Sequence, residues 1–288
     1  MSAPRILVVE GNTAEGRARH AAVGGKPAGE HYANVLRQIM PGLVADICYP
    51  ADAGANLPDR AGIEGYDGVV ITGSALNAYD RTPPVTRQVD LARAVFSTET
   101  PFFGSCWGLQ IATVALGGVV RRHPQGREVG IARAIRLTQE GVRHPLYDGK
   151  PSVFDAIAVH MDDVETAALG TTVLATNDWS PIQAAEIKTN ACTFWGVQYH
   201  PEYTFGEIAA VMRRIAPSML EQGLFHSMGE LNVHVAELDT LHRNPADKPL
   251  RWRYGVGDAV ADFAKRTREI RNWLTHQVLP TRSRRGRE

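Results

Sequence analysis

A cysteine lies between two glycines at the point where an apolar run changes into a helical pattern. In the stretch FFGSCWGLQIA, residues 102–112, Cys106 follows a short β-rich run and precedes apolar residues at helical spacing. This order matches the G-x-nucleophile-x-G turn, in which Gly104 and Gly108 leave room for a strand to turn sharply into a helix. The turn would present the thiol at the helix N-terminus, where unpaired N–H groups stabilise a thiolate. A buried core thiol would also fit this pattern, so other segments must decide.

A histidine and a glutamate two residues apart supply what a cysteine nucleophile lacks. His200 and Glu202 lie in YHPE, at the end of the apolar run CTFWGVQYH. A cysteine nucleophile requires an imidazole that takes and returns its proton, and the imidazole requires an acceptor that fixes its tautomer. We expect His200 to be the base and Glu202 to orient it. The alternative is a surface histidine followed by a helix-start carboxylate, which an elbow cysteine makes the weaker interpretation.

Acyl chemistry through a tetrahedral intermediate also requires two donors aimed at the developing oxyanion. The stretch VVITGS, residues 69–74, is typical of a buried strand that ends in a glycine-opened loop. We expect one donor to be the backbone N–H of Trp107, after the cysteine, and the other to be the backbone N–H of Gly73. The simpler interpretation of Gly73 is that it only permits a turn.

Alternating strand and helix patterns position these segments. The stretches RILVVEG, VADICYP, YDGVVITG and TPFFGS are short apolar runs typical of buried parallel strands. Between them, residues 30–40 and 85–96 carry apolar side chains at three- and four-residue spacing, as amphipathic helices do. This order predicts an α/β fold, with an open, mostly parallel sheet, helices on both faces and a site at the carboxyl ends of the strands.

The second half of the chain departs from this alternation. Strand patterns lie close together from about residue 119 to 200, which predicts a β-rich extension before the last strand returns to the sheet. We expect residues 1–216 to form the main domain and residues 217–288 to form a helical extension that packs on it. A helix over about 258–279 has an apolar face that must dock, and the basic end, 281–288, is expected to be disordered.

The connection over residues 11–32 is long and rich in glycine. A surface loop is the simpler prediction, and a lid or a loop ordered by a partner is the alternative. Its VGGKP stretch is not a phosphate-binding loop, because Pro27 stands where a hydroxyl residue would hold magnesium. We therefore expect no ATP site here.

Composition argues against several classes of function. Lys and Arg together equal Asp and Glu, at 31 each, so the overall charge does not favour nucleic acid or an anionic membrane. The three cysteines, Cys48, Cys106 and Cys192, form no CxxC pair, which argues against a disulfide framework or a zinc knuckle. The start lacks a signal-peptide apolar segment, and no apolar run approaches the roughly 20 residues of a membrane span. We expect a soluble, cytoplasmic protein without a metal site.

Combined in this order, VVITGS, FFGSCWGLQIA and FWGVQYHPE resemble the class I, triad-type glutamine amidotransferases, in particular their stand-alone, GMP-synthase-like group. The segments HPLYDG, AVHMDDV and QAAEI lie between the second and third motifs, as in that group. The resemblance implies the flavodoxin-like fold of the family and a catalytic triad of Cys106, His200 and Glu202. It also implies that the backbone N–H groups of Gly73 and Trp107 form the oxyanion hole.

The resemblance covers about residues 4–215 and extends to substrate contacts. Gln110, four residues after the cysteine, matches the family position that helps to hold glutamine. His160 and Asp162 match the H-x-D segment near the amino-acid end of the substrate. No metal or organic cofactor is implied for this reaction.

These observations leave three functions open. The first is a glutaminase that hydrolyses the side-chain amide of glutamine through a Cys106 γ-glutamyl thioester and releases ammonia for a partner synthase. The second is a stand-alone γ-glutamyl peptidase or hydrolase that acts on another γ-glutamyl amide. The third is a catalytically silent subunit that keeps the fold for partner binding. The helical extension could cap the domain, bind the synthase or form a homodimer.

Overall fold

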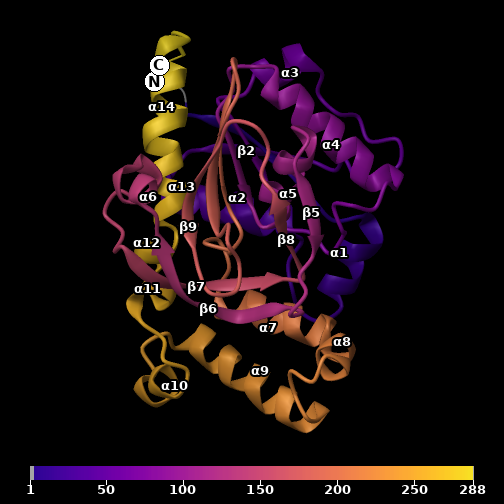
Figure 1. Ribbon diagram of the computed structural model, residues 1–288, viewed down its shortest axis with the longest axis vertical. Helices are drawn as coiled ribbons and strands as arrows, with labels where there is room; N and C mark the ends of the chain where they lie inside the picture. The colour runs from indigo at the N-terminus through magenta and orange to yellow at the C-terminus, as the bar shows by residue number, and fades with distance from the viewer. Residues whose placement is uncertain (1–2, 288) are drawn as a thin grey trace.

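The computed structural model describes residues 3–287 and contains a nine-stranded sheet (Figure 1). In spatial order its strands are β2 (Val44–Cys48), β1 (Arg5–Val9), β3 (Gly68–Ile71), β4 (Phe102–Ser105), β11 (Thr193–Val197), β10 (Ala184–Lys188), β9 (Thr171–Thr176), β6 (Glu128–Leu137) and β7 (Val153–His160). The pairs from β2 to β11 are parallel, and those from β11 to β7 are antiparallel. A separate ribbon pairs β5 (Val119–Arg122) with β8 (Asp162–Thr166).

The described residues also form helices on both sides of the sheet. These are α1 (Ala14–Ala21), α2 (Ala28–Ile39), α3 (Arg60–Glu64), α4 (Pro83–Phe96), α5 (Trp107–Ala115), α6 (Gln139–Arg143), α7 (Phe205–Arg214), α8 (Ala216–Glu221), α9 (Met228–Arg243), α10 (Lys248–Arg253), α11 (Asp258–Ala261), α12 (Phe263–Arg266), α13 (Arg268–Trp273) and α14 (Leu279–Arg284). A 3₁₀ turn, η1 (Pro145–Tyr147), and a π-helical turn, η2 (Leu274–Val278), complete the set. No helix within residues 3–287 is long and apolar enough to cross a membrane.

Alternating side chains of the central strands enter two apolar cores. On β1, Ile6 and Val8 face a core shared with α2 and α13, whereas Leu7 and Val9 face a core shared with α4 and α5. All four side chains are almost completely buried, as expected of a strand covered on both faces. In Figure 1, α13 and α14 lie on one side of the sheet and α3 and α4 on the other. The predicted α/β fold is confirmed, and the β-rich extension is its antiparallel half.

The segment over residues 11–32 differs from the expected surface loop, because it contains α1 and the start of α2. Thr13 is the N-cap of α1, and its side chain accepts a hydrogen bond from the N–H of Gly16 at 3.1 Å. Glu15 follows in the first turn, where a carboxylate favours the helix. Thr13 and Glu15 are therefore a helix start signal in this segment. The glycine content of the segment favoured a loop prediction instead.

The C-terminal helical region is not the one continuous helix that was expected over about 258–279. Asp262 has extended backbone angles (φ −82°, ψ 126°) and caps α12 by accepting a hydrogen bond from the N–H of Lys265. An aspartate at such a position favours a helix start over helix continuation. The side chains of Ile270, Leu274 and Val278 are nonetheless fully buried against the main sheet.

The basic end differs from the expected disordered tail. Residues up to Arg284 continue α14, and the guanidinium groups beyond it bind the end of α3. Arg285 donates to the carbonyl of Tyr66 at 3.0 Å, and Arg287 donates to that of Glu64 at 2.6 Å. Cations are favoured at a helix C-terminus, where carbonyl groups lack partners. The positive charge that suggested a solvated tail is what holds these residues in place.

A buried polar cluster joins the C-terminal region to the strand that carries the candidate histidine. Tyr199, which precedes His200, donates a hydrogen bond to Glu269 of α13 at 2.6 Å. Lys150 forms an ion pair with the same carboxylate, and both of these charged side chains are almost completely buried. Removing one member of such a buried pair would leave an uncompensated charge. Helix α13 therefore contacts the segment that leads from β11 to His200.

Candidate active site

Cys106 occupies a strained turn between β4 and α5. Its backbone has φ 52° and ψ −98°, a conformation that non-glycine residues rarely adopt. A Cβ atom on Gly104 would lie 2.7 Å from the backbone of Gly108, and one on Gly108 would lie 2.6 Å from the carbonyl oxygen of Ile71. Neither position has room for a side chain, so both glycines have the role that the elbow pattern predicts.

The sheet order brings the three predicted segments together. Strands β3, β4 and β11 are neighbours, so their carboxyl ends meet at one edge. The N–H of Cys106 donates to the carbonyl of Val197 at 2.7 Å, which ties the elbow directly to β11. A Cβ atom on Gly73 would lie 2.6 Å from Cε1 of His200, so the loop after β3 packs against the imidazole.

His200 and Glu202 form a buried pair beside the cysteine. Nδ1 of His200 lies 2.7 Å from Oε1 of Glu202, and both side chains are nearly inaccessible to solvent. The ring of Tyr203 stacks on the imidazole at 3.9 Å and 10°. Burial disfavours the charged imidazole, but the Glu202 carboxylate and the Cys106 thiol outweigh it and raise the pKa of His200 to about 10. Nδ1 of His200 is used by Glu202, so Nε2 is the ring nitrogen that is left to exchange a proton with Cys106.

The predicted oxyanion donors are the backbone N–H groups of Trp107 and Gly73. Trp107 is the first residue of α5, where helix N–H groups have no intrahelical acceptor. Its indole N–H donates to Gln88 at 2.7 Å, and the amide of Gln88 donates to the carbonyl of Gly11 at 3.1 Å. These bonds fix the Trp107 backbone at the turn. Gly73 lines a cavity together with His200, as an oxyanion donor would.

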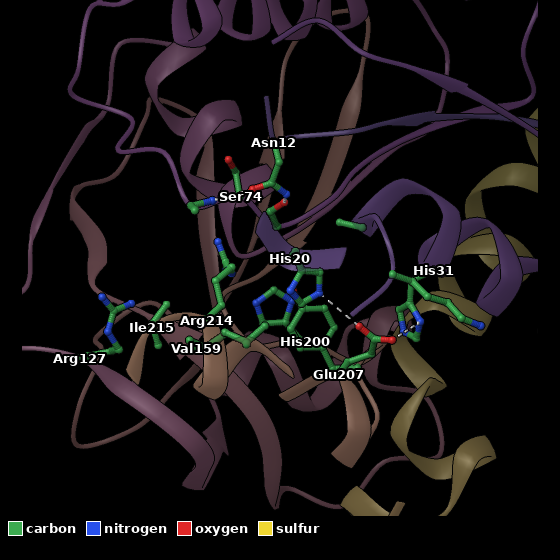
Figure 2. A pocket seen from close by; sticks show the side chains of 16 residues that line it. Asn12, His20, His31, Ser74, Arg127, Val159, His200, Glu207, Arg214 and Ile215 are labelled. Carbon is green, nitrogen blue, oxygen red and sulfur yellow. Dashed lines mark hydrogen bonds and ion pairs between the residues drawn. The ribbon is translucent and has the colours of Figure 1, made fainter. Parts of the chain in front are cut away.

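Two cavities meet at the catalytic pair. The first, here called the Cys106 cavity, has a volume of about 290 Å³, and its lining includes Cys106, Gln110, Asp162, Tyr79, Arg122 and Arg127. The second, here called the His200 cavity, has a volume of about 150 Å³, and its lining includes His200, Gly73, Lys26, Arg127, Glu207 and Arg214 (Figure 2). Arg127 lines both, so the cavities form two sides of one site.

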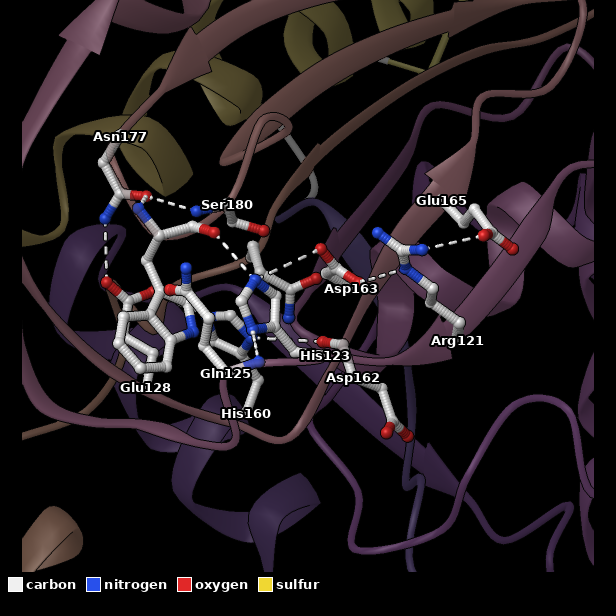
Figure 3. A network of polar contacts seen from close by, with 12 residues as sticks. Arg121, His123, Gln125, Glu128, His160, Asp162, Asp163, Glu165, Asn177 and Ser180 are labelled. Carbon is white, nitrogen blue, oxygen red and sulfur yellow. Dashed lines mark hydrogen bonds and ion pairs between the residues drawn. The ribbon is translucent and has the colours of Figure 1, made fainter. Parts of the chain in front are cut away.

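The remaining predicted substrate residues surround the Cys106 cavity. The side-chain N–H₂ of Gln110 donates to the backbone carbonyl of Asp162 at 3.0 Å. The imidazole of His160 is 2.7 Å from a Glu128 carboxylate oxygen and 3.1 Å from the carbonyl of Asp162, as part of the network in Figure 3. Both ring nitrogens of His160 are therefore engaged by the protein, which suits a residue that shapes the cavity wall rather than a proton-transfer group.

Asp162 is the acidic group of the Cys106 cavity. Burial raises the pKa of its carboxyl group to about 6, although the hydroxyl of Tyr79 donates to Oδ1 at 3.3 Å and opposes that shift. Near neutral pH the group is a carboxylate that faces Arg122 and Arg127 across the same cavity. An acid and two guanidinium groups together fit the ammonium and carboxylate of an amino acid.

Sequence reasoning missed the charged wall of the His200 cavity. Glu207 lies between two imidazoles, 3.6 Å from Nε2 of His20 and 3.4 Å from Nδ1 of His31 (Figure 2). Arg127 and Arg214 are half-buried, and neither forms a hydrogen bond or an ion pair with another residue in the range 3–287. His20 and His31 lie on α1 and α2, Arg127 precedes β6, and Glu207 and Arg214 lie on α7; none belongs to a motif that could have singled it out.

Among the described residues, no group of three or more His, Cys, Asp or Glu side chains is arranged to hold a metal ion. The arrangement that is present consists of a thiol on a strained turn at a helix start and an imidazole held by a carboxylate. Such a set can carry out nucleophilic acyl transfer.

Comparisons with known proteins agree with this geometry. Residues 34–215 match the family described as Glutamine amidotransferase class-I. The chain is 35% identical over 286 residues to a gamma-glutamyl-L-1-hydroxyisopropylamide hydrolase from Pseudomonas sp. The aligned residues cover 97% of this chain and 95% of that protein. It is 32% identical over 177 residues to the glutamine-hydrolyzing GMP synthase of Leifsonia xyli subsp. xyli, but these span only 61% of this chain and 31% of that one.

Solved structures show the same fold. A glutamine amidotransferase from Thermotoga maritima superimposes with a TM-score of 0.61 at 19% identity, over 96% of this chain and 99% of that one. The sequence match over residues 34–215 includes the cysteine elbow and the YHPE segment. This chain therefore belongs to the class I glutamine amidotransferase family.

Proposed function

We propose that the chain is a stand-alone hydrolase of N-substituted γ-glutamyl amides. The observation that carries this proposal is the His200 cavity, which offers about 150 Å³ beside the proton-transferring imidazole. Ammonia, the leaving group from glutamine, is no larger than a water molecule, and about 10–15 Å³ of such cavity volume is enough to hold one water. A substituted amine would use the remaining space. The relative from Pseudomonas sp, which matches over nearly the whole chain, is named for hydrolysis of such an amide.

The catalytic roles follow from the geometry at the strand ends. Cys106 is the nucleophile, His200 is the general base and acid, and Glu202 orients the imidazole and stabilises its charged form. The backbone N–H groups of Gly73 and Trp107 would receive the oxyanion of each tetrahedral intermediate.

The two cavities give the substrate a direction. The general acid must protonate the departing nitrogen, so the amine must lie on the side of His200. The γ-glutamyl group then occupies the Cys106 cavity, where Asp162 faces its α-ammonium group and Arg122 and Arg127 face its α-carboxylate. Gln110 and His160 shape the wall of that cavity.

The reaction balances as two acyl transfers. The proton of the Cys106 thiol already lies on the imidazole of His200, whose pKa is about 10, and the sulfur bonds to the γ-carbonyl carbon as the carbonyl π electrons move to the oxyanion. The C–N bond then breaks as His200 returns the proton to the nitrogen, which leaves a γ-glutamyl thioester and a free amine. Water next gives a proton to His200, and its oxygen bonds to the carbonyl carbon. The C–S bond breaks as glutamate leaves, and the proton stays on His200, as it did before the reaction.

A second candidate is the glutaminase that delivers ammonia to a synthase. The similarity to a GMP synthase over 61% of this chain favours it, and it uses the same catalytic residues. The two candidates differ only in the nitrogen substituent of the preferred amide.

Release of glutamate from glutamine and from γ-glutamyl amides of small amines tests both candidates. We expect kcat/KM to be higher for a substituted amide than for glutamine, and we expect Cys106→Ala to lower it at least about 10³-fold for every substrate. Cys48→Ala is the matched control, because burial raises the pKa of Cys48 to about 12 and it lines neither cavity. Activity that survives Cys106→Ala would contradict the mechanism, and a preference for glutamine would favour the glutaminase.

A further inference from the structure

The His200 cavity has an uneven charge. Three cationic side chains line it, those of Lys26, Arg127 and Arg214, against the single carboxylate of Glu207. This excess exists before any protonation of the two imidazoles that contact Glu207. Contact with those histidines, together with Lys26, outweighs burial and lowers the pKa of Glu207, so its charge is already matched. The positive charge of the arginines is therefore not compensated within the cavity.

Arg214 is the least compensated of these groups. It is the last residue of α7, it is half-buried, and its Nε is inaccessible to solvent without a hydrogen-bond partner in residues 3–287. Its neighbour Arg213 is equally half-buried but forms an ion pair with Asp239 of α9. A guanidinium nitrogen that is buried without a partner is costly, so a ligand anion is the natural counterpart of Arg214.

Arg127 extends this positive surface to the catalytic centre. It lines both cavities, and its Nε is also buried without a partner in the described chain. If Arg127 contacts the α-carboxylate of the γ-glutamyl group, Arg214 and Lys26 still outnumber Glu207 on the leaving side. A cationic amine, such as a diamine, would meet repulsion there, and a neutral amine would leave Arg214 unpaired.

Resting on the proposed function, we infer that the leaving group carries a carboxylate, so that the substrates are γ-glutamyl amino acids and Arg214 binds the carboxylate of the departing residue. A planar guanidinium can bind a carboxylate through two parallel hydrogen bonds, which neither ammonia nor an amino alcohol can accept in that way.

Two substrates of one carbon skeleton test this inference. γ-Glutamyl-L-alanine and γ-glutamyl-L-alaninol differ only in a carboxylate against a hydroxymethyl group on the leaving amine. With the full chain, we expect kcat/KM to be higher for the alanine compound. In Arg214→Gln, this preference should fall about ten- to hundredfold, because a charge-assisted pair is lost for one substrate only. Arg214→Lys, which keeps the charge without the planar fork, should retain part of the preference.

Arg213→Gln is the matched control, since it removes the neighbouring guanidinium on the same helix and should leave the preference unchanged. Thermal unfolding of each variant separates loss of fold from loss of recognition. If Arg214→Gln lowered kcat/KM equally for both substrates, the inference would be overturned, because Arg214 would then contact the γ-glutamyl group that both substrates share. So would a wild-type preference for the alaninol compound. Failure of the wild type to hydrolyse any γ-glutamyl amide would instead overturn the proposed function.

Discussion

The two cavities that meet at the catalytic pair differ in their balance of charge. In the Cys106 cavity, the carboxylate of Asp162 faces two guanidinium groups, and its walls are held by a continuous hydrogen-bond network. In the His200 cavity, cations outnumber the one carboxylate, and Arg214 has no partner in the described chain. A balanced, pre-ordered wall suits the γ-glutamyl group that every substrate shares. An unbalanced wall suits the part of the substrate that selects one amide over another.

Breaking the catalytic pair should affect both sides of this comparison equally. Glu202→Gln keeps the shape of the orienting residue but removes its charge, so we expect kcat to fall about 10²- to 10⁴-fold for every γ-glutamyl amide. The pKa of His200, raised to about 10 in the wild type, should fall, and the alkaline limb of the rate profile should move to lower pH. An unchanged profile would show that Glu202 does not control His200.

The same pair makes a contribution to stability that depends on pH. The pKa of His200 is raised above its ordinary 6.5 to about 10. The charged imidazole therefore stabilises the fold fully below about pH 6.5, and this contribution is lost as the pH rises through about 10. Denaturant unfolding from pH 7 to 10 should show a smaller loss of stability in Glu202→Gln than in the wild type.

Asp162→Asn should weaken binding of the γ-glutamyl group in the Cys106 cavity and leave the choice of leaving amine unchanged. We expect KM to rise roughly tenfold for the alanine and alaninol compounds alike, since a carboxylate partner of the α-ammonium group is lost. In the wild type, the pKa of Asp162 is about 6, so KM should rise as the pH falls below 6. The variant should lose that pH dependence. A change in the ratio between the two substrates would place Asp162 on the leaving side instead.

The smallest effect on activity should come from a change in the His200 cavity, where the leaving amine is proposed to bind. Glu207→Gln removes the single carboxylate of the His200 cavity, so the preference for the alanine compound over the alaninol compound should rise about two- to fivefold. Glu221→Gln on α8, an exposed position, is the control. A falling preference would mean that Glu207, through His20 and His31, shapes the cavity rather than setting its charge.

Much of the fold could be predicted, and the segments of the candidate site could be named, because the signals were local. The elbow around Cys106 and the segment from His200 to Glu202 are short motifs at strand ends, and the parallel sheet brings such ends to one edge. Apolar alternation in β1 likewise identified a strand covered on both faces. In each case, neighbours in sequence determine the local geometry.

The rest depended on contacts between distant segments. Arg127 and Arg214 line the same cavity but are far apart in the sequence, because the strands of the antiparallel half of the sheet lie between them in the chain. No motif spacing therefore connects them. The docking of Arg285 on the end of α3 is equally non-local, since its partners are backbone carbonyls that carry no sequence signal. Composition indicated a solvated end there because it reports the charge of a segment but not the groups that it meets.

The bond from the N–H of Cys106 to the carbonyl of Val197 has a consequence for how this protein can change over evolutionary time. Because this bond joins the turn after β4 to the end of β11, the pairing of these two strands sets the distance between Cys106 and His200. Arg214, by contrast, belongs to a helix that follows the catalytic strand, and its substitution leaves that bond untouched. A lineage could therefore exchange one leaving amine for another by altering single residues of the cavity wall, while the machinery of acyl transfer is inherited intact.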